Sequence, residues 1–103
     1  MLKDDVLVSA LVNQNKVVDK RNKYIANFKA LCPNDKNIVD KYKCKIYSKK
    51  TIMVEEINEY LASFEKRAVY QEDLTDVIFN HFECEKVVLI GEHIDVKIKS
   101  ISI

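Results

Sequence analysis

A cysteine followed by a proline is the pattern in this chain most able to do covalent chemistry. Cys32 and Pro33 follow the apolar run of residues 28–31 and precede a polar stretch that carries Asp35 and Asp40. Proline cannot donate to a strand ladder and biases the preceding residue toward extended backbone. The pattern therefore predicts a thiol at a strand end, beside a loop with two carboxylates. Such a thiol can ionise and act as a nucleophile, although a lone cysteine more often behaves as a small core residue.

Length and composition limit the class of protein. With 103 residues the chain suits one domain and one core, so we expect a single domain over residues 1–103. About half of the residues are apolar and the formal net charge is +1, so no global basic field indicates a nucleic-acid partner. No apolar run reaches the roughly 18 residues of a membrane span, and the acidic start of the chain is not typical of a signal peptide. We expect a cytoplasmic protein without membrane contact.

The three cysteines are an odd number and contain no Cys-x-x-Cys pair: Cys32, Cys44 and Cys84. This argues against a disulfide framework or a zinc knuckle and fits a reducing cytosol. No His/Cys/Asp spacing predicts a metal site. His81 is expected to be a surface or packing residue of a helix, whereas His93 lies near a bend where it could approach a site.

Hydrophobic periodicity divides the chain into expected strands and helices. Alternation or apolar runs predict strands over 5–13, 24–31, 42–47, 87–90 and 94–99. For residues 5–13 a short helix is the alternative. A polar connection is expected over 14–22 and a bend at 91–93. Apolar residues at helical spacing predict helices over 57–64 and 74–82.

This order predicts an α+β fold, an antiparallel sheet with both helices on one face. The other face carries Lys43, Lys45, Asp95, Lys97 and Lys99 and is expected to be solvated or to line a wet channel. Free sheet edges predict self-association.

Four blocks, in order and with matching gaps, resemble the tunnelling-fold (T-fold) nitrile enzymes. These are the NADPH-dependent 7-cyano-7-deazaguanine reductases (QueF) and their shorter QueF-like relatives. The first block, residues 28–33, resembles the strand that ends in the family's nucleophilic cysteine. The second block, residues 55–64, resembles the family helix that ends in a Ser-aromatic pair. The third block, residues 70–74, resembles the family's aromatic-His-Glu stretch, with Gln at the His position. The fourth block, residues 87–92, resembles the closing strand. The resemblance implies a T-fold with a four-stranded antiparallel sheet that joins other subunits into a barrel.

The resemblance also implies a role for particular residues. Cys32 would add to a nitrile carbon of a deazaguanine and form a covalent thioimide, and an aspartate would transfer protons to the nitrile nitrogen. The family aspartate lies seven residues after the cysteine, where this chain has Val39. Asp40 follows one residue later, and Asp35 is a competitor. Glu72 would accept hydrogen bonds from the guanine-like edge of the base. The remaining substrate-binding positions are held by Ser63, Phe64 and Gln71.

Two departures separate the chain from the reductases. In place of their Glu-Ser-Lys-Ser-like cofactor motif the chain has Met53-Val54-Glu55-Glu56, and an acidic pair would repel an NADPH phosphate. The arginine-glycine-glycine motif near the reductase C-terminus is also missing. The resemblance therefore favours the QueF-like branch, which adds ammonia to the nitrile of a tRNA base and makes the formamidine of archaeosine without a cofactor.

Several alternatives stay open at this point. The chain could be the NADPH-dependent reductase, or a non-catalytic T-fold binding module that has lost the chemistry. The base could be free, in tRNA or in DNA. Lysine clusters over residues 41–50 and 16–23 would meet phosphate if the base lies in tRNA, although charge runs more often mark a solvated face. The family implies a homo-oligomer, pentamers that pair into decamers, with sites between neighbouring subunits.

Overall fold

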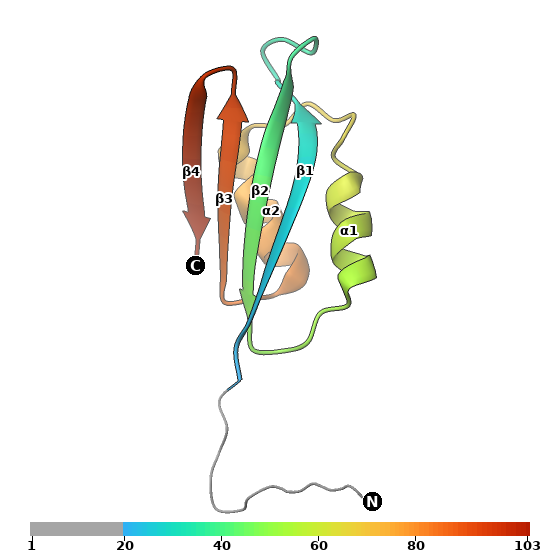
Figure 1. Cartoon of the computed structure of the whole chain (residues 1–103), viewed down its shortest axis with the longest axis vertical. Coiled ribbons are helices and arrows are strands. Elements are labelled where there is room, and N and C mark those ends of the chain that lie inside the picture. The colour runs from blue at the N-terminus through green and yellow to red at the C-terminus, as the bar shows by residue number, and fades with distance from the viewer. Residues whose placement is uncertain (1–19) are drawn as a thin grey trace, which may run out of the picture.

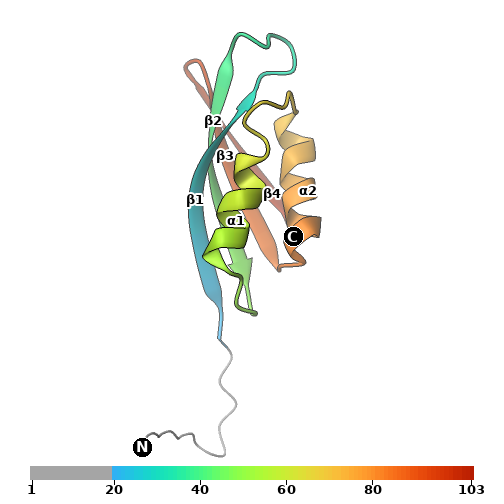
Figure 2. The same cartoon turned by 90° about the vertical axis from the view of Figure 1, so that its right-hand side faces the viewer.

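The protein is described by a computed structural model over residues 20–103. A four-stranded antiparallel sheet is covered on one face by two helices (Figure 1, Figure 2). The elements are β1 (Asn22–Leu31), β2 (Val39–Ser48), α1 (Val54–Ala62), α2 (Gln71–Phe82), β3 (Lys86–His93) and β4 (Val96–Ser102). The strands lie side by side in chain order, β1-β2-β3-β4. The predicted α+β architecture is confirmed, while the strand expected over residues 5–13 lies outside the described residues.

Alternation along β2 shows how the sequence separates the two faces of the sheet. Tyr42, Cys44 and Ile46 are buried on the helix-covered face, whereas Lys41 and Lys43, which alternate with them along the strand, are exposed. The helices bury one apolar stripe each against these residues, as the helical spacing predicts. The helix residues in this core are Ile57, Leu61, Leu74, Ile78 and Phe82. Among residues 20–103, no helix has the length and hydropathy that a membrane crossing requires.

An aromatic cluster joins β1, α1 and α2. Phe64 is 1% exposed, and its ring centroid lies 5.2 Å from that of Tyr60. The ring of His81 stacks on Tyr60 at 3.6 Å between centroids. His81 is therefore a packing residue of α2, as the sequence predicts, and Phe64 belongs to the core.

The expected bend over residues 91–93 is wrong. Gly91 and His93 both lie within β3, where they pair with Ile98 and Val96 of β4. The turn falls at residues 94–95, and Ile94 takes the left-handed backbone region there with φ 57°. Gly91 is a glycine for a different reason, because its missing side chain leaves room for two neighbours that shape the candidate site.

Candidate active site

Backbone hydrogen bonds hold the end of β1 and thereby place the Cys32 thiol. The Leu31 N–H donates to the Arg67 carbonyl at 2.9 Å, and the Val69 N–H donates to the Leu31 carbonyl at 3.4 Å. The segment that leads into α2 therefore runs beside the strand end. The Cys32 N–H donates to the Ile38 carbonyl at 3.0 Å and closes the loop between β1 and β2. The thiol stands just past the strand end, as predicted, and the first turn of α2 stands next to it.

A cavity of about 340 Å³ lies between this strand end, the start of α2 and the end of β3. Cys32 lines it although the residue is only 5% exposed, so the residue is almost fully buried where it borders the cavity. Asp40 and Glu72 line the same cavity. The volume falls at the lower end of the roughly 300–1,000 Å³ that small-molecule sites occupy. One chain thus brings the predicted nucleophile, both predicted proton carriers and the predicted base anchor to a single cavity.

His93 joins this group, although no motif assigned it a role. Its Nδ1 lies 2.6 Å from Oδ1 of Asp40, a buried carboxyl group. The sheet register explains the contact: Lys41 pairs with Glu92, so Asp40 and His93 stand one step further along the same two strands. The thiol, carboxyl and imidazole atoms of Cys32, Asp40 and His93 all lie within 4.8 Å of one another. A nucleophile therefore stands beside a hydrogen-bonded carboxyl–imidazole pair that holds a proton between its two members.

Tyr42 is a second site residue that the sequence did not single out. It lies two residues after Asp40 on the same face of β2 and lines the cavity. Burial raises the pKa of Tyr42 to about 12, and the negative charges of Asp40, Cys32 and Glu72 act in the same direction. Its phenol therefore stays protonated at neutral pH and can donate a hydrogen bond. Only the alternation of β2 could have indicated this position.

The first two residues of α2 serve different purposes. Glu72 is exposed and lines the cavity, so its carboxylate can meet a ligand there. Gln71 is buried, and its Nε2 donates to the Leu89 carbonyl at 3.1 Å and to the Ile98 carbonyl at 2.7 Å. The amide hydrogens of Gln71 thus attach α2 to β3 and β4. Gln71 lines the cavity, but both of these hydrogen bonds support the wall of the site.

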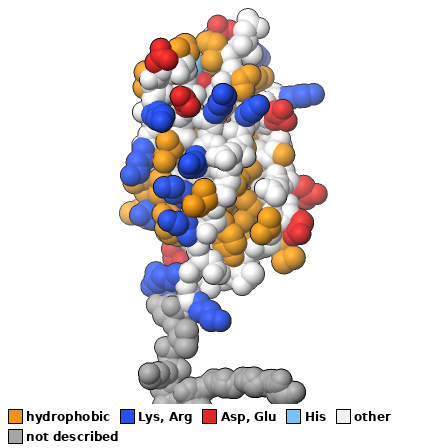
Figure 3. All heavy atoms as spheres, in the orientation of Figure 1, with side chains coloured by type: hydrophobic (Ala, Val, Ile, Leu, Met, Phe, Trp, Pro, Cys, Tyr) orange, Lys and Arg blue, Asp and Glu red, His pale blue; other side chains and the backbone are white. Residues whose placement is uncertain are grey.

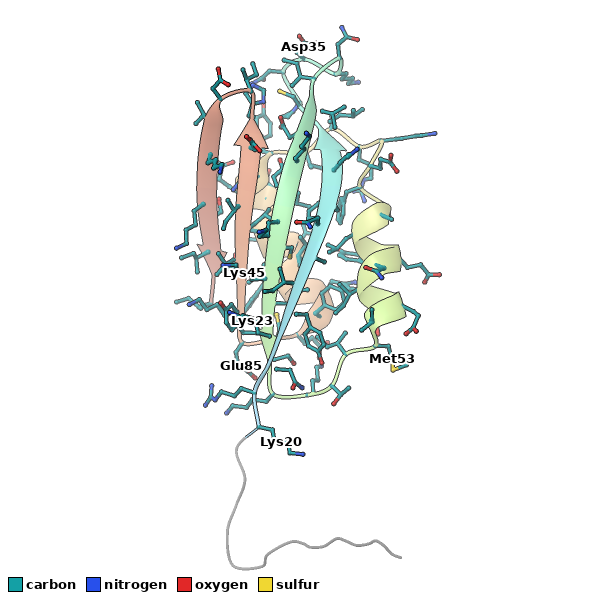
Figure 4. The ribbon with its side chains drawn as sticks, viewed as in Figure 1. Lys20, Lys23, Asp35, Lys45, Met53 and Glu85 are labelled. Carbon is teal, nitrogen blue, oxygen red and sulfur yellow. The ribbon has the colours of Figure 1, made fainter. Side chains whose placement is uncertain are left out.

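Three other predicted site residues, Asp35, Ser63 and Phe64, do not belong to the group of side chains around the Cys32 thiol. Asp35 is exposed at the rim of the cavity, where its Oδ1 accepts the Asn37 N–H at 3.0 Å (Figure 4). Ser63 ends α1, and its hydroxyl donates to the Tyr60 carbonyl. Phe64 is in the core. Within the described chain the structure therefore places Asp40, and not Asp35, beside the thiol, and it does not bring Ser63 or Phe64 to this cavity.

Cys32, Asp40 and His93 also form a set of ligands that Zn²⁺ accepts. Thiolate, carboxylate and imidazole are its usual protein ligands, and a catalytic zinc keeps one position for water or substrate. No sequence spacing predicted this set, because the three residues come from three parts of the chain. The Asp40–His93 hydrogen bond would have to give way to a metal. A bound metal would also occupy the thiol that the nitrile chemistry requires.

Replacing Gly91 with alanine should destabilise both the fold and the cavity. A Cβ at this position would lie 2.7 Å from Cε1 of Tyr42 and would collide with Oε1 of Gln71. We expect the free energy of unfolding to fall by about 1–3 kcal/mol, the usual cost of overpacking a core. Urea denaturation measures it, with the exposed Lys99→Ala as the control on β4. An unchanged midpoint for Gly91→Ala would contradict this close packing.

Thiol reagents should separate the three cysteines. Cys44 is fully buried, and burial followed by the charge of Cys84 raises its pKa to about 12. Burial also raises the pKa of Cys84. The thiolate fraction of Cys44 at pH 8 is therefore on the order of 10⁻⁴. We expect iodoacetamide to label Cys32 first, as read by peptide mass spectrometry, and all three after unfolding in urea. Faster labelling of Cys84 in the native protein would contradict the placement of the Cys32 thiol.

The fold and the cavity together define a T-fold monomer with a cysteine and a carboxyl group at the end of its sheet. No protein-family profile matches the chain, and no curated protein matches its sequence. Among solved structures, the chain is similar to the crystal structure of the archaeosine synthase QueF-Like in the apo form. The two share 15% identity over 84% of this chain and 94% of that chain, with a TM-score of 0.67. This likeness confirms the predicted fold of the single chain.

Proposed function

We propose that this chain is a nitrile enzyme of the archaeosine synthase type, which converts a 7-cyano-7-deazaguanine base to a formamidine. The observation that carries the proposal is the meeting of Cys32, Asp40 and Glu72 at one cavity within one chain. These residues come from the end of β1, from β2 and from α2, and each has the residue type that a family role requires. The fold shared with the archaeosine synthase supports the assignment.

The first step of the proposed reaction forms a thioimide. The Cys32 thiolate attacks the nitrile carbon, and one carbon–nitrogen π bond opens as the new carbon–sulfur bond forms. The nitrile nitrogen takes a proton from the Asp40–His93 pair, whose heavy atoms lie 2.6 Å apart. Proton transfer by a positioned pair of this kind contributes about 10²–10⁴ in rate. This chain has Gln71 where the family has a histidine. A histidine is nevertheless present at the cavity, because His93 lines it from β3.

The second step releases the amidine. Ammonia attacks the thioimide carbon and returns one proton to the Asp40–His93 pair, and the carbon–sulfur bond then breaks to give back the thiolate. Nitrile and ammonia together contain every atom of the product, so the step needs no oxidant or reductant. We therefore propose ammonium as the nitrogen donor and no cofactor. The exposed pair Glu55 and Glu56 in the first turn of α1 agrees with this, since it would repel a dinucleotide phosphate.

Glu72 is the proposed anchor of the base. A guanine-like edge presents two adjacent N–H donors, and a carboxylate accepts both in a charge-assisted pair. The exposed carboxylate of Glu72 lies at the cavity that holds the thiol, so it can orient the ring while Cys32 attacks. Tyr42 adds a protonated phenol that can donate to the nitrile nitrogen. The base that this site receives is proposed to lie in tRNA.

Intact-protein mass spectrometry tests the proposal. The full chain is incubated with 7-cyano-7-deazaguanine, and in parallel with a tRNA transcript that carries the nitrile base, each with and without EDTA. We expect one covalent adduct on Cys32 that EDTA does not affect, and its conversion to the formamidine when ammonium is added. Consumption of NADPH together with the nitrile would instead establish a reductase. A folded protein that forms no adduct with either probe would be a binding module.

We also propose that the chain works as a homo-oligomer, a pentamer or a pair of pentamers. The outer strands β1 and β4 each have one edge without a partner strand in the described chain. Large apolar side chains are exposed on β1, on β4 and at Ile103, which follows β4. These residues are Ile25, Val96, Ile98, Ile101 and Ile103. Strand pairing between subunits would cover them. Sedimentation velocity measures the assembly, and a monomer at working concentration would contradict it.

A further inference from the structure

The wall of the Cys32 cavity carries one sign of charge. Its lining includes the carboxyl groups of Asp35, Asp40, Glu72 and Glu92, and no lysine or arginine of the described chain lines it. The lysines of the strands gather instead over the sheet face that no helix covers (Figure 3). A cleft lined by one sign of charge raises the local concentration of counter-ions. The space in front of the thiol therefore favours a cation.

Three groups in this wall have the chemistry of metal ligands. The thiol of Cys32, the carboxyl group of Asp40 and the imidazole of His93 offer ligand atoms that all lie within 4.8 Å of one another. Over residues 20–103 no other set of three such side chains comes this close together. Thiolate, carboxylate and imidazole are the protein ligands of Zn²⁺, whereas Mg²⁺ and Ca²⁺ prefer oxygen alone. The set therefore selects zinc.

The three groups need only small movements to bind one ion. Zinc bonds of about 2.0–2.3 Å at tetrahedral angles place neighbouring ligand atoms about 3.3–3.6 Å apart. Oδ1 of Asp40 and Nδ1 of His93 are 2.6 Å apart, so they would separate by about 0.7 Å. The sulfur of Cys32 would approach by at most about 1.3 Å. The His93 side chain is 36% exposed, so packing leaves it room to make this adjustment.

The charges of the three groups also suit a divalent ion. A thiolate and a carboxylate neutralise Zn²⁺, and a neutral imidazole adds no charge. This matters because Cys32 and Asp40 are buried, where a net charge is costly. On binding, a zinc–sulfur bond replaces the sulfur–hydrogen bond and the thiol proton leaves to solvent. The proton between Asp40 and His93 moves to Nε2 of the imidazole, and nothing is oxidised or reduced.

We propose that Zn²⁺ binds Cys32, Asp40 and His93 in competition with the nitrile substrate and reversibly blocks the enzyme. Three protein ligands leave the fourth tetrahedral position to a water molecule in the cavity. The ion engages the sulfur and also the carboxyl–imidazole pair, so it removes the nucleophile and the proton donor together. The loss of activity rests on the proposed function, but zinc binding does not require the nitrile reaction.

Metal titration of the full chain tests the site without any substrate. The chain is freed of metal with EDTA, the chelator is removed, and zinc chloride is added in a calorimeter. We expect one ion per chain, and an affinity at least about 100-fold lower for Cys32→Ala, Asp40→Asn and His93→Gln, since even the loss of an outer-shell partner costs about 10–100-fold. Asp35→Asn makes the matched change at the rim of the same cavity and should alter affinity less than about threefold. Circular dichroism verifies that each variant is folded.

A spectrum and a labelling rate identify the sulfur ligand. Co²⁺ in place of zinc should give a thiolate-to-cobalt charge-transfer band that Cys32→Ala abolishes and Cys84→Ala preserves. One equivalent of zinc should slow the labelling of Cys32 by iodoacetamide at least about tenfold, because a metal-bound thiolate is a poor nucleophile, and excess EDTA should restore it. The adduct of Cys32 with 7-cyano-7-deazaguanine should slow and recover in the same way.

Three results would overturn the proposal. Zinc affinity that is unchanged in Cys32→Ala and His93→Gln would place the ion elsewhere. Equal weakening in Asp35→Asn and Asp40→Asn would mean that the acidic wall only attracts cations. Faster amidine formation with zinc than with EDTA would make the ion an activator. A chain that binds zinc and protects Cys32 from iodoacetamide, yet forms no nitrile adduct in EDTA, would contradict the proposed function and leave the metal site intact.

Discussion

Replacing Cys32 with alanine should abolish the covalent adduct with a 7-cyano-7-deazaguanine and leave the fold in place. The thiol is the strongest nucleophile among the three residues that meet at the cavity, and the change removes one sulfur atom from a residue that borders an existing space. We expect no mass increase on the intact protein, and a loss of amidine formation by at least about 10³. Intact-protein mass spectrometry and product analysis measure the two effects.

Two further variants make this test specific. Cys32→Ser preserves the shape of the side chain but replaces the thiol by a hydroxyl that does not ionise near neutral pH, so we expect it to be equally inactive. Cys84→Ala removes a thiol outside the cavity and should leave adduct formation unchanged. An adduct that persists in Cys32→Ala and disappears in Cys84→Ala would move the nucleophile to a different site and contradict the assignment.

Replacing Asp40 with asparagine should slow both adduct formation and amidine release by about 10²–10⁴. The amide keeps the size of the carboxyl group, and its oxygen can still accept a hydrogen bond from the His93 ring, but it cannot take up or release the proton that the nitrile nitrogen requires. Single-turnover rates with the free base measure the first step, and ammonium-dependent decay of the adduct measures the second.

Asp35→Asn is the matched control, because it makes the same chemical change at the rim of the same cavity. Asp35 is exposed, and one of its oxygens already accepts the Asn37 N–H, so we expect a rate change of less than about threefold. His93→Gln should show an intermediate loss, since glutamine can hydrogen-bond to Asp40 but cannot carry a proton. A larger loss for Asp35→Asn than for Asp40→Asn would exchange the two assignments.

Local patterns carry most of the information about the elements. Alternation over residues 42–47 and helical spacing over 74–82 predict β2 and α2, because a half-buried strand and a half-buried helix each repeat their apolar residues with a fixed period. The bend placed at Gly91 shows the limit of this reasoning. A glycine in sequence indicates a turn, but here its hydrogen atom faces Tyr42 and Gln71 from the interior of β3.

The element order, the two-layer fold and the position of Cys32 at a strand end could all be predicted from the chain alone, since each follows from periodicity or from the backbone restriction of proline. The groups that surround the thiol could not be predicted, because they depend on long-range strand pairing. Asp40 and His93 are separated by 53 residues, and they meet through the register of β2 against β3. The sequence predicts Lys43, Lys45, Lys97 and Lys99 on the sheet face that no helix covers. The lysines of the other two strands join them only through the same pairing: Lys23, Lys29 and Lys86.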